Sequence, residues 1–156
     1  MNNITFRQVI VIPTLLHWRK EAIENVFGIS PSKALLVANR RYYQQHIADS
    51  SHIAIVAVVG GLDVGCGAIC LSEELPSPDN PSGRCAYLMN IYVRAEHRGI
   101  GIGHAIVRWL VTKASELGCD KIYLETTDGA RSLYKSIGFE ELHGIMKYAD
   151  IQNRES

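Results

Sequence analysis

A glycine-rich turn between a predicted strand and a predicted helix constrains the fold of this chain more than any other segment. Residues 92–104 read YVRAEHRGIGIGH, with glycine at the alternate positions 99, 101 and 103. An apolar, β-prone run from Cys85 to Val93 precedes the turn, and a helical pattern from Gly101 to Leu117 follows it. Glycine adopts positive φ and lets a ligand approach the main chain, and the first turn of a helix presents unpaired N–H groups to phosphate oxygens. The segment therefore predicts a pyrophosphate-binding turn.

The spacing of the turn excludes two common phosphate-binding motifs. A P-loop has Lys and then Ser or Thr after its last glycine, and His104-Ala105 stands there instead. The dinucleotide fingerprint G-x-G-x-x-G requires a glycine where His104 stands. The pattern that remains is Arg98-x-x-Gly101-x-Gly103, for which a glycine-rich surface turn is the alternative interpretation, so the flanking segments decide between the two.

Two flanking segments give the turn a family context. Upstream lies the β-prone run Leu88-Met89-Asn90-Ile91-Tyr92-Val93, and downstream lies Ala130-Arg131-Ser132-Leu133-Tyr134 followed by Gly138-Phe139. With these motifs in this order, the segment from Ala86 to Glu141 resembles the GCN5-related N-acetyltransferases (the GNAT superfamily). Their acetyl-CoA signature is Q/R-x-x-G-x-G/A.

The resemblance implies a single-domain α/β fold of mixed α+β type. Its twisted sheet is mixed but mostly antiparallel, has splayed central strands and is flanked by helices. The residue pattern predicts the order β-α-α-β-β-β-α-β-α-β-β, with a domain at residues 1–149 and a polar tail at 150–156. The expected strands are 4–10, 52–59, 64–72, 85–93, 121–126, 139–142 and 145–148, and the expected helices are 13–27, 31–47, 101–117 and 128–137.

In function, the resemblance implies an acetyl-CoA-dependent N-acetyltransferase in which a primary amine attacks the thioester directly in a ternary complex. The alternative is a non-catalytic acyl-CoA-binding sensor or interaction module on the same fold. The acceptor stays open between a small molecule, a peptide N-terminus and a protein lysine. The family shapes its acceptor site with segments that correspond here to about Trp18 to Tyr43 and Glu73 to Arg84. Homodimers are common in the family, but the sequence identifies no interface.

The resemblance also assigns the cofactor-binding residues. The backbone N–H groups of residues 98–104 are expected to hold the phosphates, with added charge from Arg98. The strand before them offers its main chain to the pantetheine arm. Thr127 stands where many family members have asparagine, and it has fewer donors and acceptors. The full set is Ile91, Tyr92, Val93, Arg98, Gly99, Ile100, Gly101, Ile102, Gly103, His104, Thr127 and Tyr134.

Three side chains are candidates for catalysis. Tyr134 is the expected general acid because its L-Y-x-x-x-G-F context matches the family, although a tyrosine beside Leu133 and Ile137 also suits a packing role. Glu125, at the end of the fifth strand, could point into the cleft, and Asn90 could position a water. Neither has a matching motif, and residues at such positions are more often ordinary exposed strand-end or loop residues.

Composition disfavours several other classes of function, among them nucleic-acid binding, membrane spanning and metal binding. A length of 156 residues predicts one domain, and sixteen basic residues cancel sixteen acidic ones, which disfavours nucleic acid and anionic membranes as partners. The longest apolar run, Ile53 to Val59, is too short to span a bilayer, and the N-terminus lacks a signal-peptide pattern. Four cysteines without a C-x-x-C pair predict reduced thiols and no metal site. Cytoplasmic location is therefore the expectation.

Overall fold

The computed structural model describes residues 3–150 and confirms the mixed α/β class. Five strands form one sheet in the order β1-β2-β3-β4-β5, with antiparallel neighbours except for the parallel pair β4 and β5. The strands are β1 (Ile4–Val9), β2 (His52–Val59), β3 (Leu62–Glu73), β4 (Arg84–Val93) and β5 (Lys121–Leu124). The helices are α1 (Ile12–Val26), α2 (Lys33–Ala48), α3 (Ile102–Glu116) and α4 (Arg131–Ile137), with 3₁₀ turns η1 (Ala95–His97) and η2 (Asp128–Ala130).

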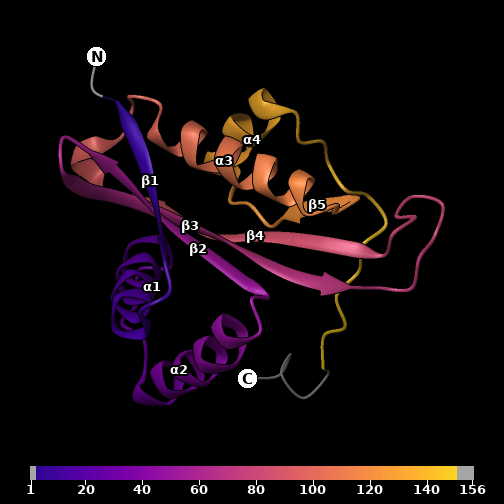
Figure 1. Ribbon diagram of the computed structural model, residues 1–156, viewed down its shortest axis with the longest axis horizontal. Coiled ribbons are helices and arrows are strands. Elements are labelled where there is room, and N and C mark those ends of the chain that lie inside the picture. Colours follow the sequence, from indigo (N-terminus) through magenta and orange to yellow (C-terminus); the bar gives the residue numbers. More distant parts are fainter. Residues whose placement is uncertain (1–2, 151–156) are drawn as a thin grey trace.

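The sheet lies between two helical layers, α1 and α2 on one face and α3 and α4 on the other (Figure 1). Alternate side chains of each strand enter separate cores. On the α3 face, Ile55, Leu88 and Ile106 are buried together, and on the α1 face Trp18, Val56 and Tyr92 are buried together. Both faces of the central strands are therefore covered, which explains the continuous apolar runs in their sequences.

Glycine in β3 lets α3 approach the sheet closely. A Cβ on Gly67 would lie 2.7 Å from Ile106 Cγ2 and 3.0 Å from Leu110 Cδ1. Any larger residue here would push α3 away from the sheet. Because α3 begins directly after the glycine-rich turn, this contact also fixes the turn relative to the strands.

The splayed central strands are present. Cys85–Leu88 of β4 pairs with Lys121–Leu124 of β5, and from Met89 onward β4 has no partner strand on that side among residues 3–150. β4 also carries a bulge, because the pairing with β3 shifts between Cys66 and Ala68, opposite Asn90. Asn90 has φ +54°, a left-handed conformation that asparagine tolerates better than most residues. The second half of β4 therefore presents a bent, open edge.

The two final strands predicted at 139–142 and 145–148 are wrong: the described chain forms no strand after β5. The Phe139 N–H donates to the Tyr134 carbonyl (3.0 Å), and Glu141 pairs with Arg131, so the chain stays against α4 and does not run along β5. Beyond it, Ile145 and Met146 are 65% and 94% exposed. Two short apolar pairs separated by a glycine were not enough to specify a paired strand.

The other boundaries differ by a few residues. β5 ends at Leu124 and not at residue 126, and α2 begins at Lys33 because the Ser32 hydroxyl accepts the Leu35 N–H (3.1 Å). Of the predicted polar tail, residues 151–156 lie outside the described part of the chain. No helix within residues 3–150 has the length and apolar character needed to cross a membrane.

Candidate active site

The glycine-rich turn ends at the first turn of α3 and presents a row of free amides. Gly99 and Gly101 have φ +80° and +89°, and Gly101 is the N-cap of α3 without any side-chain cap. No backbone N–H from Gly99 to His104 donates to another described residue, and the first amide to do so is that of Ala105, which bonds the Gly101 carbonyl (3.0 Å). The row and the helix dipole suit phosphate oxygens.

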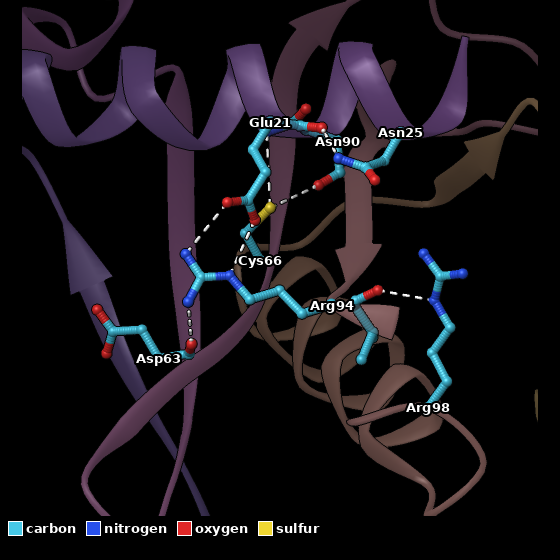
Figure 2. Close-up of polar contacts among 8 residues, drawn as sticks. Glu21, Asn25, Asp63, Cys66, Asn90, Arg94 and Arg98 are labelled. Atoms are coloured by element: carbon cyan, nitrogen blue, oxygen red, sulfur yellow. Dashed lines mark hydrogen bonds and ion pairs between the residues drawn. The ribbon is translucent and has the colours of Figure 1, made fainter. Parts of the chain in front are cut away.

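Two arginines hold β4 and this turn in place (Figure 2). The Arg94 guanidinium donates to both carboxylate oxygens of Glu21 on α1 (2.9 and 3.2 Å) and to the Asp63 carbonyl (2.9 Å). Arg98 reaches back, and its Nε donates to the Val93 carbonyl (2.8 Å). Because one bond uses only Nε, the two terminal nitrogens of the exposed Arg98 stay available for an anion.

The three strand residues predicted to contact the cofactor through their main chain lie on the open part of β4. Ile91 and Val93 pack their side chains against the α3 core. Tyr92 is buried on the opposite face, where its ring lies 6.4 Å from that of Trp18. These side chains all face the two cores, which leaves the backbone edge toward β5 for a ligand.

Asn90 lies at the bulge with both ends of its amide engaged. Its Oδ1 accepts a hydrogen bond from Arg19 Nη1 (3.0 Å), and its Nδ2 lies 3.8 Å from Cys66 Sγ. Cys66 in turn donates to the Asn90 carbonyl (3.2 Å). These contacts support the left-handed bulge and place a half-buried guanidinium directly beside it.

Glu125 and Thr127 follow β5 on the other side of the gap, and both are exposed. Glu125 directly follows Leu124, which pairs with Leu88, so it lies at the end of the β4–β5 pairing. Burial raises the pKa of Tyr87 on β4, and the Glu125 carboxylate raises it further. Thr127 is the N-cap residue of η2 but makes no side-chain capping bond. Its hydroxyl is therefore free of that role.

Tyr134 lies on α4, which packs beside the start of α3: Leu133 Cδ2 would be 3.5 Å from a Cβ at Gly103. The Tyr134 side chain is 9% exposed and packs edge-on against Phe139, with ring centroids 5.8 Å apart. Its hydroxyl bonds to no described residue, and burial raises its pKa, so the group keeps its proton at neutral pH. Such a hydroxyl suits a proton donor.

A cavity of about 440 Å³ lies away from the glycine-rich turn. β5, α4 and residues 138–142 line it, including Ile122, Tyr134 and Phe139. It exists because the chain after α4 does not pair with β5. None of residues 98–104 lines it, so we place the candidate active site at the open edge of β4 and the turn, despite the cavity's size.

Comparison with known proteins identifies the family. The profile of the acetyltransferase (GNAT) family matches residues 13–139. The chain belongs to the GNAT acetyltransferase family. The crystal structure of a predicted acetyltransferase from Clostridium acetobutylicum, solved with acetyl-CoA, superposes with a TM-score of 0.84 over 94% of this chain and 96% of that one, at 25% identity.

Curated relatives match over shorter segments. The bovine thialysine N-epsilon-acetyltransferase is 40% identical over 95 residues, which cover 47% of this chain and 56% of that protein. A probable glucosamine 6-phosphate N-acetyltransferase from rice is 39% identical over 59 residues, which cover 38% of this chain and 36% of that protein. The chain thus spans about half, or less, of the length of these GNAT relatives.

Sequence reasoning missed three residues that shape this GNAT site. Arg19 and Glu21 lie on α1, and Arg94 lies at the end of β4. Arg94 could have been noticed, because it directly follows an apolar strand. Arg19 and Glu21 could not, because no local sequence pattern shows that α1 contacts β4. Among residues 3–150, no group of three His, Cys, Asp or Glu side chains is arranged to hold a metal ion.

Proposed function

We propose that this GNAT protein is an acetyl-CoA-dependent N-acetyltransferase that transfers the acetyl group to a primary amine. The observation that carries the proposal is the row of six consecutive free amides, Gly99 to His104, at the start of α3 beside the open edge of β4. Such a row binds a pyrophosphate group, and an open strand edge binds an extended arm that carries amide groups. Acetyl-CoA combines both features in one molecule.

In this proposal different residues bind different parts of acetyl-CoA. Acetyl-CoA supplies the acetyl group in activated form, as a thioester. The amides of residues 99–104 and the free end of Arg98 bind the phosphates, and the main chain of Ile91 to Val93 binds the pantetheine arm. Thr127 adds a hydroxyl at the far side of the gap.

The direct reaction needs a neutral amine and a proton for the leaving sulfur. The amine nitrogen forms the new C–N bond as the C–S bond breaks, and the Tyr134 hydroxyl gives its proton to the sulfur. Asn90 and Glu125 flank the gap in which the amine approaches. In this proposal the Glu125 carboxylate takes the proton that the amine loses, directly or through a water positioned by Asn90.

The test is an amine panel assayed for release of the free thiol of CoA, together with calorimetry of acetyl-CoA binding. The panel includes diamines, amino acids, amino sugars and peptides, because related proteins are named for thialysine, glucosamine 6-phosphate and aminoglycosides as substrates. We expect acetyl-CoA binding and amine-dependent thiol release. Binding without turnover of any amine would favour the non-catalytic sensor, and absence of binding would refute both functions.

A further inference from the structure

Arg19 is a half-buried arginine without a carboxylate partner. Among residues 3–150, no carboxylate lies within 4.0 Å of its guanidinium, and its single hydrogen bond goes to the neutral amide of Asn90 (3.0 Å). The nearby Arg94 differs, because two bonds join it to Glu21, and so does Arg7, which is paired with Asp63. A guanidinium has five N–H donors, so most of those of Arg19 remain unused.

Four buried titratable groups near Arg19 are uncharged at neutral pH. Burial is the main cause of the pKa shift in four of them, Tyr43, His52, Cys66 and Cys70, and the positive charge of Arg19 adds a smaller lowering to each. The pKa of Tyr43 is raised to about 12, that of Cys66 to about 12, and that of His52 is lowered to about 4. None of these groups can neutralise the guanidinium.

Tyr43 is a second polar group in the neighbourhood of Arg19, whose positive charge slightly lowers its pKa against the larger effect of burial. Its side chain is 4% exposed, and its hydroxyl bonds to no described residue. It comes from α2 and lines the same small cavity as Asn90, which the guanidinium of Arg19 on α1 contacts. An unneutralised, partly desolvated cation leaves an electrostatic deficit that a bound anion would correct.

We propose that Arg19 binds a carboxylate group on the acceptor amine, so that the preferred acceptors are amino carboxylates. The forked guanidinium matches the two oxygens of a carboxylate. One unpaired arginine balances one negative charge, whereas a phosphate dianion calls for more than one cation. The site lies at the β4 bulge, where the open edge of β4 begins, so a carboxylate held there places the rest of the molecule at the gap. The inference rests on the proposed acetyltransferase function.

The first experiment compares amines that differ only by a carboxylate, such as L-lysine with cadaverine and L-ornithine with putrescine. We expect kcat/KM to be higher for the amino carboxylate in each pair.

In Arg19→Gln, which removes the charge and keeps an amide near Asn90, we expect KM for the amino carboxylate to rise about 10- to 100-fold. KM for the diamine should change by less than about threefold in the same variant. Arg19→Lys should recover part of the loss, because it restores the charge without the fork. Arg108→Gln, which changes an exposed arginine of α3, is the matched control.

The second experiment measures binding without turnover, by calorimetry of L-lysine and cadaverine on wild type and Arg19→Gln in the presence of CoA. Binding of lysine that weakens in the variant supports the carboxylate site even if no amine is acetylated, in which case only the proposed function fails. Diamines that react as well as their amino acids, or no Arg19-dependent binding of any amino carboxylate, would overturn the inference. The acetyltransferase function would survive that result.

Discussion

At the scale of single residues, the glycine-rich turn shows two different reasons for a glycine. A Cβ on Gly99 or Gly101 would meet no atom within 4 Å, but the positive φ of both residues strains any L side chain. Gly103 has no positive φ, and a Cβ there would make ordinary contacts with Leu133 and Val93. The backbone requires the first two glycines, and nothing in the protein itself requires the third. This agrees with the G/A alternative at the end of the family signature.

The difference gives a matched pair of variants. We expect Gly101→Ala to weaken acetyl-CoA binding about tenfold or more, because left-handed strain of about 1–2 kcal/mol reorients the free amides. Gly103→Ala should change affinity by less than about threefold, since an ordinary Cβ contact costs little. Calorimetry on both folded variants is the measurement. Equal losses of acetyl-CoA affinity in the two variants would show that the left-handed conformation of the turn does not determine binding.

Tyr134 allows a separation of chemistry from packing. Tyr134→Phe keeps the ring contact with Phe139 and removes a hydroxyl that has no described partner, so stability should change by less than about 1 kcal/mol. If the hydroxyl is the proton donor, kcat should fall toward the low end of ~10²–10⁴-fold, because a thiol of pKa ~8.5 leaves tolerably as thiolate. Acetyl-CoA affinity should stay the same.

The measurement combines kcat, acetyl-CoA Kd and melting temperature on the same Tyr134→Phe preparation. Tyr148→Phe is the control, because Tyr148 is 87% exposed. An unchanged kcat with a competent amine would reduce Tyr134 to a packing residue. A fall in kcat together with a lower melting temperature would show that the substitution reduces activity by destabilising the fold.

At the scale of elements, α2 is joined to β2 by a buried polar contact. The Tyr42 hydroxyl lies 2.8 Å from His52 Nδ1 and 2.9 Å from Cys70 Sγ, and the His52 ring packs edge-on against those of Tyr42 and Tyr43. Burial lowers the pKa of His52 from 6.5 to about 4. The imidazole is therefore neutral in the folded protein above that pH, and charging it opposes the packing of α2.

This contact predicts acid sensitivity. Between pH 6.5 and about 4 the unfolded chain binds a proton at His52 that the folded chain does not, so stability falls as the pH is lowered and levels off below the folded pKa. The contribution of His52 is at most about 3 kcal/mol. Urea unfolding of wild type and His52→Gln from pH 7 to pH 4 measures it.

The variant should lose less stability over that range than wild type does. His17→Gln, at an exposed position of α1, should behave like wild type. Parallel pH profiles for wild type and His52→Gln would contradict a neutral, buried imidazole. That outcome would also weaken the inference that the buried groups near Arg19 are uncharged.

At the scale of the whole molecule, two regions compete as the binding site. One is the turn with the open edge of β4, and the other is the cavity of about 440 Å³ beside β5. Amides without an acceptor exchange rapidly with solvent, so hydrogen exchange separates the two regions. In the free protein we expect fast exchange at residues 99–104, whose N–H groups have no described acceptor.

Acetyl-CoA should slow exchange at residues 89–104 and leave α2 unchanged, which makes α2 an internal control. The expected reason is direct hydrogen bonding of the free amides to phosphate oxygens and of the β4 edge to the ligand. Hydrogen exchange followed by mass spectrometry, with and without acetyl-CoA, makes the measurement. Protection confined to residues 138–142 would move the cofactor to the cavity and refute the proposed site.

The sequence alone determined the parts of this protein that depend on local chemistry. Strand β2 was predicted at its observed bounds, because seven β-branched or small apolar residues in a row after His52 strongly favour a strand. The glycine-rich turn and the start of α3 followed from glycine's access to positive φ and from helical periodicity. Together with the segments at Leu88 and Ala130, they carried the GNAT resemblance that the family comparison confirms.

Only the tertiary structure decided what depends on distant partners. Arg19 and Glu21 look like ordinary polar residues of α1, and only folding brings one to the bulge at Asn90 and the other to Arg94. The short apolar segments after α4 form no strand, because pairing needs an edge within reach, and the ion pair between Glu141 and Arg131 keeps the chain against α4. Local propensity specifies an element, whereas contacts between elements decide whether a strand is paired and which charge is left without a counter-ion.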